Sequence, residues 1–230
     1  MSAAMLISVV VPTLNEADVL ESTLRCLRKQ PGPLEIIVAD GGSSDGTLDL
    51  VGRDCSVVHA EPGRASQMNA GAQTAGGEVL LFLHSDTLLP ECALETVRRV
   101  VQNGTDAGIF RLAFDDKSVL LSLSAAATRL PLFSICFGDR ALFVRRSTFM
   151  ALGGFSHTPI FEDIELAKRL GRQATFRFIS ESVTTSARRY RAVGHWRQQW
   201  HNASLWLRYM LGANPEHLAR EYSYRRESSR

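Results

Sequence analysis

Three polar segments of the sequence each contain an acidic side chain that could bind a ligand or take part in catalysis. In the segment DGGSSDGT, Asp40 follows an apolar run and supplies an acceptor-only carboxylate suited to the N–H of a base or the O–H of a ribose. Gly41 would let the backbone approach such a ligand closely. A turn carboxylate is the competing interpretation of Asp40, and Asp45 is predicted to be a helix N-cap.

The segment VLLFLHSDT brings Asp86 to the end of an apolar run. A carboxylate at that place could bind Mg²⁺ or Mn²⁺ bridging two phosphates, because these cations prefer oxygen ligands and keep water in much of their shell. Ser85 precedes it, and His84 lies on the same side of the predicted strand. Zinc is a poor alternative because no third ligand stands at a matching spacing.

The segment FEDIELAKRL places Glu162 and Asp163 in the first turn of a predicted helix. The helix dipole favours acidic residues there in any protein, so a structural role is a real alternative. A helix start that faces a crevice would also hold a general base in an ordered and reachable place. Spacing supports the two interpretations equally.

A proline-marked turn follows the first apolar run, in SVVVPTLNEADVL. After Pro12, the side chains of Thr13 and Asn15 could face a ligand, while Asn15 or Glu16 could equally cap the next helix. Capping and binding are equally compatible with this segment.

Basic residues in two other segments are candidates for anion binding. Arg64, in EPGRASQMNAGA, opens a predicted helix and could meet a phosphate or a nucleobase carbonyl, although a solvated arginine is slightly favoured. Arg188 and Arg189, in ARRYR, could clamp phosphates or an anionic acceptor, and a basic surface turn is an equal alternative. Asp139, in FGDRALFVRR, is a further candidate for the phosphate or acceptor site.

Short apolar runs alternate with helical patterns in the first half, which predicts an α/β fold with a mostly parallel central sheet flanked by helices. The predicted strands are 6–11, 35–39, 56–59 and 79–83, and the predicted helices are 17–29, 46–52, 65–74 and 90–102. Because ligands bind at the carboxyl ends of strands in such sheets, the four polar strand ends are expected to converge on one crevice.

The second half has a less regular pattern. It predicts strands at 108–114, 141–145 and 175–179, and helices at 119–130, 162–170, 196–211 and 215–224. No internal repeat or Gly/Ser linker divides the chain, so we expect a single domain over 1–230. Within it, 195–224 is expected to form a helical extension and 225–230 a mobile tail.

Composition places the chain among folded proteins with no large single-sign charge. Hydrophobic residues make up 45% and charged residues 22%, and the net charge of +2 does not indicate nucleic acid as a partner. The four cysteines form no metal-binding pattern. No secretory signal is recognised, and the apolar stretch 118–127 is too short to span a membrane, so a cytoplasmic location without a transmembrane segment is expected.

The predicted helix 196–211 has an apolar side formed by Trp196, Trp200, Leu207, Met210 and Leu211. Packing against the sheet or against a second subunit of a homo-oligomer is the favoured interpretation. The alternative is a peripheral contact with the inner face of a membrane, which would bring the protein to a lipid-linked acceptor.

The motifs PTLNE, DGGSSDGT, GRASQMNAGA, HSDT, GGF and FED, in this order, resemble those of the family 2 glycosyltransferases of the GT-A fold. The resemblance covers about 7–189, and the ordered set is far more specific than any single motif. With FGDRALFVRR, SARRYR and GANPEHLAREY, the sequence looks most like the small bacterial group of radical-SAM/selenodomain-associated transferase 2 proteins.

The resemblance implies roles for particular residues. The nucleoside-binding motifs contain Thr13, Glu16, Asp40 and Arg64. Asp86 matches the last carboxylate of the family's Asp-x-Asp element, which binds metal and pyrophosphate, and Asp163 matches the catalytic base of inverting members. His84 replaces the first carboxylate of that element, so only Asp86 is a metal candidate and modest metal affinity is expected.

The resemblance implies an inverting, metal-assisted transfer of a sugar from a nucleotide donor to an acceptor hydroxyl. The expected donor is a UDP-sugar. The Gln-x-x-Arg-Trp motif of processive members is missing, so a single transfer is expected. A sugar nucleotidyltransferase is one alternative, although it would have a glycine-rich basic loop where this chain has PTLNE. A protein that binds a nucleotide sugar without transferring it is the second alternative.

Overall fold

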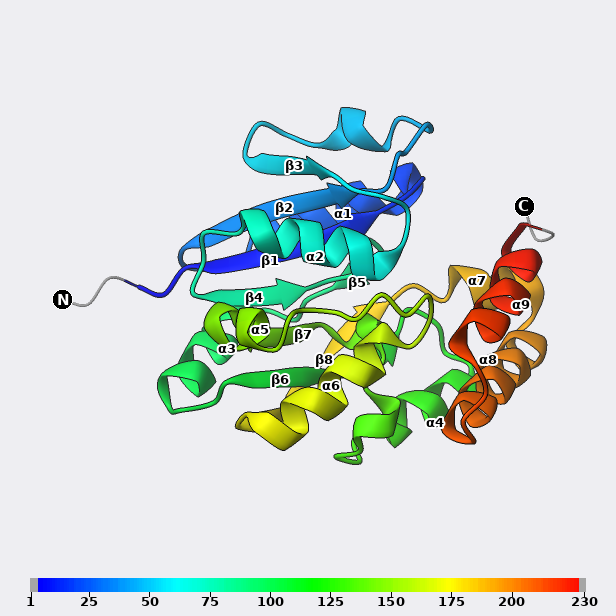
Figure 1. Ribbon diagram of the computed structural model, residues 1–230. Coiled ribbons are helices and arrows are strands. Elements are labelled where there is room, and N and C mark those ends of the chain that lie inside the picture. Colours follow the sequence, from blue (N-terminus) through cyan, green and yellow to red (C-terminus); the bar gives the residue numbers. More distant parts are fainter. Residues whose placement is uncertain (1–3, 228–230) are drawn as a thin grey trace.

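The protein is described here from a computed structural model that covers residues 4–227, and it contains one eight-stranded sheet (Figure 1). The strands lie in the order β3-β2-β1-β4-β7-β6-β8-β5. Their bounds are β1 (Ile7–Thr13), β2 (Leu34–Asp40), β3 (Cys55–His59), β4 (Val79–Phe82), β5 (Thr87–Leu88), β6 (Ala107–Phe114), β7 (Leu142–Arg145) and β8 (Phe176–Thr185).

Strands β1 to β4 are parallel to one another, as the alternating pattern of the first half predicts. The second half adds antiparallel pairs, because β7 runs opposite to both β4 and β6, and β5 runs opposite to β8. The sheet is therefore mixed, and β6 and β8 again pair in parallel. The α/β class with a mostly parallel sheet is confirmed.

Nine α-helices lie in the described part of the chain. They are α1 (Ala17–Arg28), α2 (Arg64–Thr74), α3 (Ala93–Gln102), α4 (Val119–Ala127), α5 (Arg146–Ala151), α6 (Glu162–Gln173), α7 (Arg188–Val193), α8 (His195–Met210) and α9 (Pro215–Glu227). The predicted helix 46–52 is only a short 3₁₀ turn, η1 (Thr47–Leu50). The six-residue helices α5 and α7 and the two-residue strand β5 are too short to give a periodic sequence signal.

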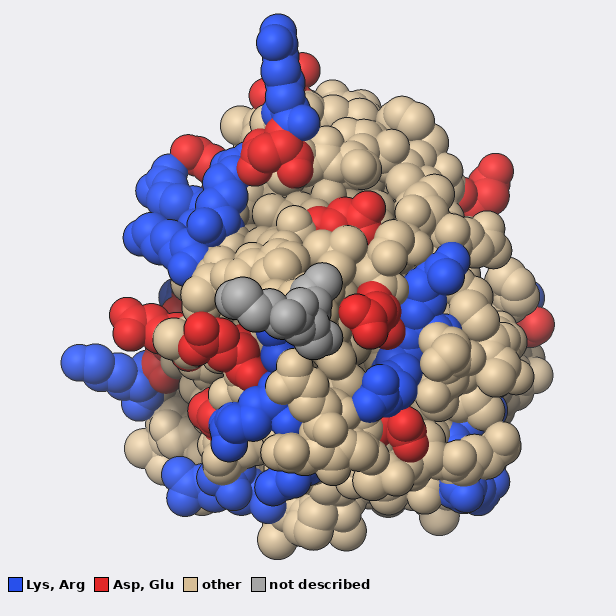
Figure 2. All heavy atoms as spheres, turned by 90° about the vertical axis from the view of Figure 1, so that its left-hand side faces the viewer, with Lys and Arg blue, Asp and Glu red and all other residues tan. Residues whose placement is uncertain are grey.

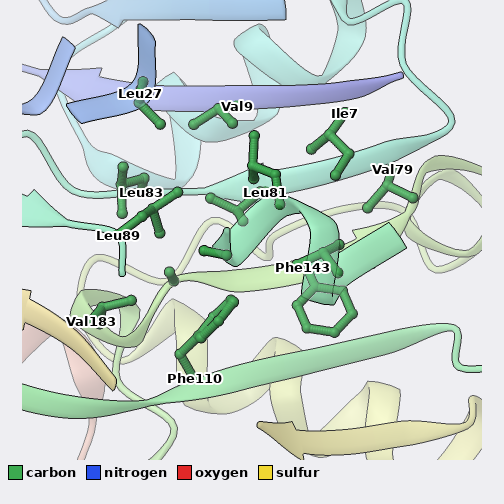
Figure 3. Close-up of a cluster of buried hydrophobic side chains, with 14 of the residues drawn as sticks. Ile7, Val9, Leu27, Val79, Leu81, Leu83, Leu89, Phe110, Phe143 and Val183 are labelled. Carbon is green, nitrogen blue, oxygen red and sulfur yellow. The ribbon is translucent and has the colours of Figure 1, made fainter. Parts of the chain in front are cut away.

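The core consists of two apolar layers, one on each face of the sheet. Along β1, Ile7, Val9 and Val11 face one layer, and Val10 faces the other, because successive side chains of a strand alternate. Helices α1 and α3 cover the first layer, part of which appears in Figure 3, and α2 and α6 cover the second. This arrangement holds the parallel strands rigidly and fixes where their carboxyl ends lie.

The C-terminal helices form a smaller cluster of their own, in which Leu205 of α8 and Leu218 of α9 pack on Ile160. The apolar side of α8 with Trp196 and Trp200 does not pack against the sheet, since both side chains are exposed. That part of the sequence prediction is wrong, because the opposite side of the helix, with Leu205, faces the interior.

Helix α9 continues to Glu227, so the predicted tail 225–230 begins inside a helix, and 228–230 lie outside the described residues. No helix among the described residues is long and apolar enough to cross a membrane. On the face at the amino end of β1, basic and acidic side chains are interspersed, so neither sign of charge dominates it (Figure 2).

Candidate functional site

The carboxyl ends of β1, β2 and β4 lie side by side, because β1 is the central strand and pairs in parallel with the other two. Thr13 ends β1, Asp40 ends β2, and His84 to Asp86 follow β4. The first turn of α6 and the start of α7 complete the site from the second half of the chain. The predicted convergence of the polar strand ends is therefore present at this edge of the sheet.

Asp40 is buried and held as an ionised acceptor. Its carboxylate accepts hydrogen bonds from the backbone N–H of Gly42 at 2.9 Å and of Ser43 at 3.0 Å, and a third from the Ser43 hydroxyl. Burial acts to raise the pKa of Asp40, but the hydrogen bonds from Ser43 and Gly42 outweigh it and lower the pKa below its usual value. Asp40 thus presents a fixed negative charge at the strand end.

Gln67, which the sequence reasoning missed, joins the first two strand ends. Its Nε2 donates to the carbonyls of Thr13 at 2.6 Å and Ala39 at 2.9 Å, and it is buried against Gly41. Gly41 in turn donates its N–H to the Thr13 carbonyl. These hydrogen bonds hold the backbone at the ends of β1 and β2 in a fixed position.

The turn after β1 has both structural and open polar groups. Thr13 is buried, and its hydroxyl has no hydrogen-bond partner, which leaves it free to contact a ligand. Pro12 lies inside β1. Asn15 instead supports the neighbouring loop, because its Oδ1 accepts from the N–H of Ser44 at 2.9 Å. Asp45 likewise acts structurally and accepts from the N–H groups of Thr47 and Ala17, the first residue of α1.

Glu16 and Asp86 are bridged by a single arginine from the far end of the chain. Nη2 of Arg188 forms an ion pair with the carboxylate of Glu16 and lies 3.4 Å from Oδ2 of Asp86. Glu16 makes no side-chain cap for α1, and Asp86 makes none for α3, whose N-cap is Cys92. The two carboxylates therefore share one guanidinium, which offsets part of their negative charge.

Gly138 separates His84 from Asp163 and leaves no room for a larger residue. A Cβ on Gly138 would lie 2.5 Å from Oδ2 of Asp163 and 2.7 Å from Nε2 of His84. Burial, together with the charges of Arg64 and Arg189, lowers the pKa of His84 to about 3. The imidazole is therefore neutral near pH 7, and its buried Nε2 has no hydrogen-bond partner.

Asp163 is buried at the start of α6 beside other acidic groups. Burial first, and then the charges of Glu162 and Asp139, raise the pKa of Asp163 well above its usual value, although Arg64 opposes them. Nε of Arg64 lies 3.7 Å from Oε1 of Glu162. Burial, with the charge of Asp86, raises the pKa of Asp139 to about 6. A carboxylate with a raised pKa is suited to accept a proton near neutral pH.

Arg140 is fully buried and fixes the segment that contains Gly138 and Asp139. Its guanidinium donates to the carbonyls of Phe110 and Ile135, each at 2.9 Å, and of Thr128 at 3.1 Å. An isolated arginine in the sequence gives no signal of this role, which depends on three distant carbonyls.

Backbone strain is concentrated beside the site. Among the described residues, four that are not glycine have positive φ angles, and three of them adjoin the site: Asn15 at 54°, Ala141 at 51° and Phe161 at 63°. They lie next to Glu16, shortly after Asp139 and directly before Glu162. Such conformations cost of order 1–3 kcal/mol each and persist where surrounding structure fixes them, commonly at functional sites.

The donor set fits a divalent cation shared with a diphosphate. Mg²⁺ and Mn²⁺ need only one or two protein carboxylates when substrate phosphates and water fill the other positions. Asp86 offers a partly exposed carboxylate, and a buried oxygen of Asp139 has no hydrogen-bond partner. Within residues 4–227, no three acidic, histidine or cysteine side chains converge as a complete metal cage.

Two of the predicted site residues, Ser85 and Arg189, make hydrogen bonds that connect the site to neighbouring helices. The carbonyl of Ser85 accepts from the Thr23 hydroxyl at 2.6 Å, which ties the site loop to α1. Arg189 donates to the hydroxyl of Tyr222 at 2.7 Å and so also links α7 to α9. A cavity of about 140 Å³ lies against Asp86, and another of about 270 Å³ lies between β6 and α4, outside this group of residues.

Comparison with solved structures shows that this chain has the GT-A fold. The crystal structure of S. aureus TarS 1-349 in complex with UDP has a TM-score of 0.67 and 20% identity, covering 79% of this chain and 60% of that one. The mannosyltransferase PcManGT from Pyrobaculum calidifontis, in complex with GDP-Man and Mn²⁺, has a TM-score of 0.67 and 20% identity, covering 89% and 62%.

The sequence gives the family. Residues 8–148 match the model described as Glycosyl transferase family 2, and the chain belongs to this family. A PGL/p-HBAD biosynthesis glycosyltransferase of Mycobacterium bovis is 36% identical over 107 residues, and the probable glycosyltransferase YdaM of Bacillus subtilis is 26% identical over 232 residues. The match spans 43% and 88% of this chain, but only 41% and 54% of the two relatives.

Proposed function

We propose that this protein transfers a sugar from a nucleotide-diphosphate donor to an acceptor hydroxyl, with inversion at the anomeric carbon and Asp163 as the general base. The observation that supports it most is the setting of Asp163. This buried carboxylate has a raised pKa and lies at an ordered helix start, next to His84 and Gly138 at the edge where β1, β2 and β4 end. Membership of glycosyltransferase family 2 supports the same reaction.

The nucleoside would bind at the ends of β1 and β2. Asp40 supplies a fixed anionic acceptor for N–H or O–H groups, and the Thr13 hydroxyl supplies an unpartnered polar group beside it. Gly41 and Gly42 carry no side chains that would block close approach of a base or ribose. We propose a uridine diphosphosugar as donor, with guanosine diphosphosugars as the alternative to be tested.

The diphosphate would lie near Asp86 and Arg188. Arg188 is paired with Glu16 and Asp86. A guanidinium binds phosphate oxygens bidentately, so a donor diphosphate would draw Arg188 from these carboxylates and leave Asp86 for a cation. A divalent cation held by Asp86 would offset the charge that develops on the leaving diphosphate.

The proposed reaction is a single displacement at the anomeric carbon of the sugar. The acceptor oxygen forms a bond to the anomeric carbon while Asp163 takes the proton of that hydroxyl. The bond between the anomeric carbon and the diphosphate oxygen breaks, and the nucleoside diphosphate leaves with the electron pair. A raised pKa improves Asp163 as a base near neutral pH, because proton transfer is most effective when the base has a pKa close to the operating pH.

We also propose that residues 1–230 act as one glycosyltransferase domain, with 195–224 as its helical extension, and that transfer is non-processive. Two other functions use the same nucleotide-sugar site: nucleotidyl transfer to a sugar phosphate, and binding without catalysis. They differ in their products. A nucleotidyltransferase releases pyrophosphate from a nucleoside triphosphate, and a binding protein releases nothing.

The test is product release from a panel of donors. Purified protein would be mixed with UDP-sugars or GDP-sugars and Mn²⁺, and nucleoside diphosphate would be measured with water or simple glycosides as acceptors. We expect turnover by the wild type and turnover lower by about 10²–10⁴-fold by Asp163→Asn, which should still bind the donor. Pyrophosphate release from nucleoside triphosphates, or turnover by Asp163→Asn equal to the wild type, would overturn the proposal.

A further inference from the structure

Exposed large apolar side chains gather on two neighbouring elements. Among the described residues, nine of the twelve exposed large hydrophobics belong to segment 119–132 or to α8 and the residue after it. These nine define what we call the α4–α8 face: Val119, Leu123, Leu130, Leu132, Trp196, Trp200, Leu207, Met210 and Leu211. Single exposed hydrophobics are ordinary, but so large a share in one region marks an interaction surface.

Helix α8 turns its apolar side outward. At 3.6 residues per turn, five apolar positions of α8 and its C-cap residue fall within about 100° around the axis. They are Trp196, Trp200, Ala203, Leu207, Met210 and Leu211. Leu205 lies on the opposite side and is buried, while Trp196 and Trp200 are 78% and 79% exposed. The helix is therefore anchored by one side and presents a tryptophan-rich stripe to its surroundings.

The two elements of the α4–α8 face adjoin each other. Helices α4 and α8 are in contact and lie at the same end of the molecule (Figure 1). The indole N–H of Trp206 donates to the carbonyl of Ser134 at 2.7 Å, which holds α8 beside the segment with Leu130 and Leu132. The exposed leucines and tryptophans thus come from two elements that are in contact with each other.

The charged side chains on these two elements are all basic, and the acidic residues directly before them, Asp115 and Asp116, are paired with Arg191 and His195. Segment 117–138 and helix α8 contain no aspartate or glutamate. Lys117, Arg129 and Arg197 are exposed there, while Arg208 is paired with Glu221 of α9. An apolar stripe bordered by uncompensated basic groups complements a surface that is apolar inside and anionic at its rim, which describes an anionic lipid bilayer.

We propose that the α4–α8 face docks on an anionic membrane surface, with Trp196 and Trp200 inserted at the level of the headgroups. Tryptophan favours this interface because its ring is apolar and its N–H is polar. Arginine side chains beside the stripe reach the lipid phosphates. A symmetric pairing with a second copy fits less well, because it brings equal basic groups together with no acidic group on these elements to pair them.

Docking would place the candidate active site beside the bilayer. Helix α7, which begins with Arg188, is joined to α8 by the single residue Gly194. The identity of the acceptor follows only if the proposed function holds: its hydroxyl would then belong to a lipid-linked molecule at the membrane surface. The docking itself does not depend on catalysis and can be measured without donor or acceptor.

The test is flotation with vesicles of phosphatidylglycerol and phosphatidylcholine, compared with pure phosphatidylcholine vesicles. We expect the wild type to float with the anionic vesicles, with less binding at high salt. Trp196→Gln/Trp200→Gln should reduce the partition constant by about tenfold or more, since binding scales with buried apolar area. Met150→Gln, which changes an exposed apolar residue of α5 outside the face, should bind like the wild type.

Quenching of tryptophan fluorescence by brominated lipids would report insertion directly. A wild type that stays unbound, or equal flotation of the double variant, would overturn the docking proposal. A dimer in sedimentation velocity that the double variant abolishes would also overturn it, because the face would then bind a second copy. Donor turnover measured in parallel without vesicles separates failure of docking from failure of the proposed reaction.

Discussion

Gly138→Ala should lower the catalytic rate of each folded molecule by displacing the carboxylate of Asp163. The new Cβ would lie 2.5 Å from Oδ2 of Asp163, where ordinary van der Waals contact begins at 3.4 Å, so the overlap is about 0.9 Å. Gly138 belongs to the segment fixed by Arg140, so the carboxylate of Asp163 has to move by about that distance. A misplacement of about 1 Å costs roughly 10²-fold in rate.

Two matched variants separate catalysis from overpacking. Gly171 lies on the same helix as Asp163, about 12 Å farther along it. Gly171→Ala places a Cβ 2.3 Å from the ring of Phe133. Overpacking in either variant costs about 1–3 kcal/mol of folding free energy, measured by urea unfolding. Gly76→Ala, whose Cβ would have its nearest neighbour at 3.8 Å, should resemble the wild type in both stability and rate.

The assay is release of nucleoside diphosphate from the donor that the wild type uses best, with donor affinity measured separately. We expect kcat to fall about 10²-fold for Gly138→Ala, while Gly171→Ala keeps its rate per folded molecule. Wild-type kcat for a folded Gly138→Ala protein would refute the reasoning. An equal loss of kcat in Gly171→Ala would refute it as well, because the effect would then come from general overpacking.

Four further predictions follow from the site. Asp163→Asn should lower kcat by about 10²–10⁴-fold and raise the melting temperature, because a buried carboxylate beside Glu162 is removed; a lower melting temperature would contradict this. Activity should fall as pH drops through the raised pKa of Asp163. Glu162→Gln should move this acidic limb of the pH–rate profile to lower pH, because one of the charges that raise the pKa of Asp163 is lost. An acidic limb that stays at the wild-type pH would argue against this cause. Asp86→Asn should lower kcat about a hundredfold and weaken the response to Mn²⁺, and an unchanged titration with Mn²⁺ rejects the assignment. Gln67→Met should lower the free energy of unfolding in urea by about 1–3 kcal/mol, because the carbonyls of Thr13 and Ala39 lose the N–H that donates to them. It should also raise the KM for the nucleotide sugar. Full wild-type stability would show that the two carbonyls find other partners.

Local patterns in the sequence were sufficient to predict the parallel half of the sheet and the residues at its edge. Apolar runs that alternate with helical segments fix β1 to β4, and polar residues directly after a buried strand must lie at its carboxyl end. For this reason the positions of Asp40 and Asp86 at this edge could be predicted, while their roles stay a prediction. The antiparallel direction of β7 in the sheet could not be predicted, because the direction of a strand depends on long-range pairing rather than on composition.

The remaining parts of the site depend on contacts between residues that are distant in the sequence. Arg188 meets Glu16 across 172 positions of the chain, and Arg140 fixes its segment through three backbone carbonyls that leave no mark on residue type. The role of Gly138 is steric and appears only when His84 and Asp163 are in place. For α8, periodicity identified the apolar side but not whether that side faces the core.

A crystal structure of Asp163→Asn with its donor and Mn²⁺ tests most directly whether these separate segments form one nucleotide-sugar site. The account predicts the base and ribose at Asp40 and Thr13, the diphosphate at Asp86 and Arg188, and the anomeric carbon facing residue 163. A nucleotide bound elsewhere, such as in the cavity between β6 and α4, or a sugar turned away from residue 163, would contradict it.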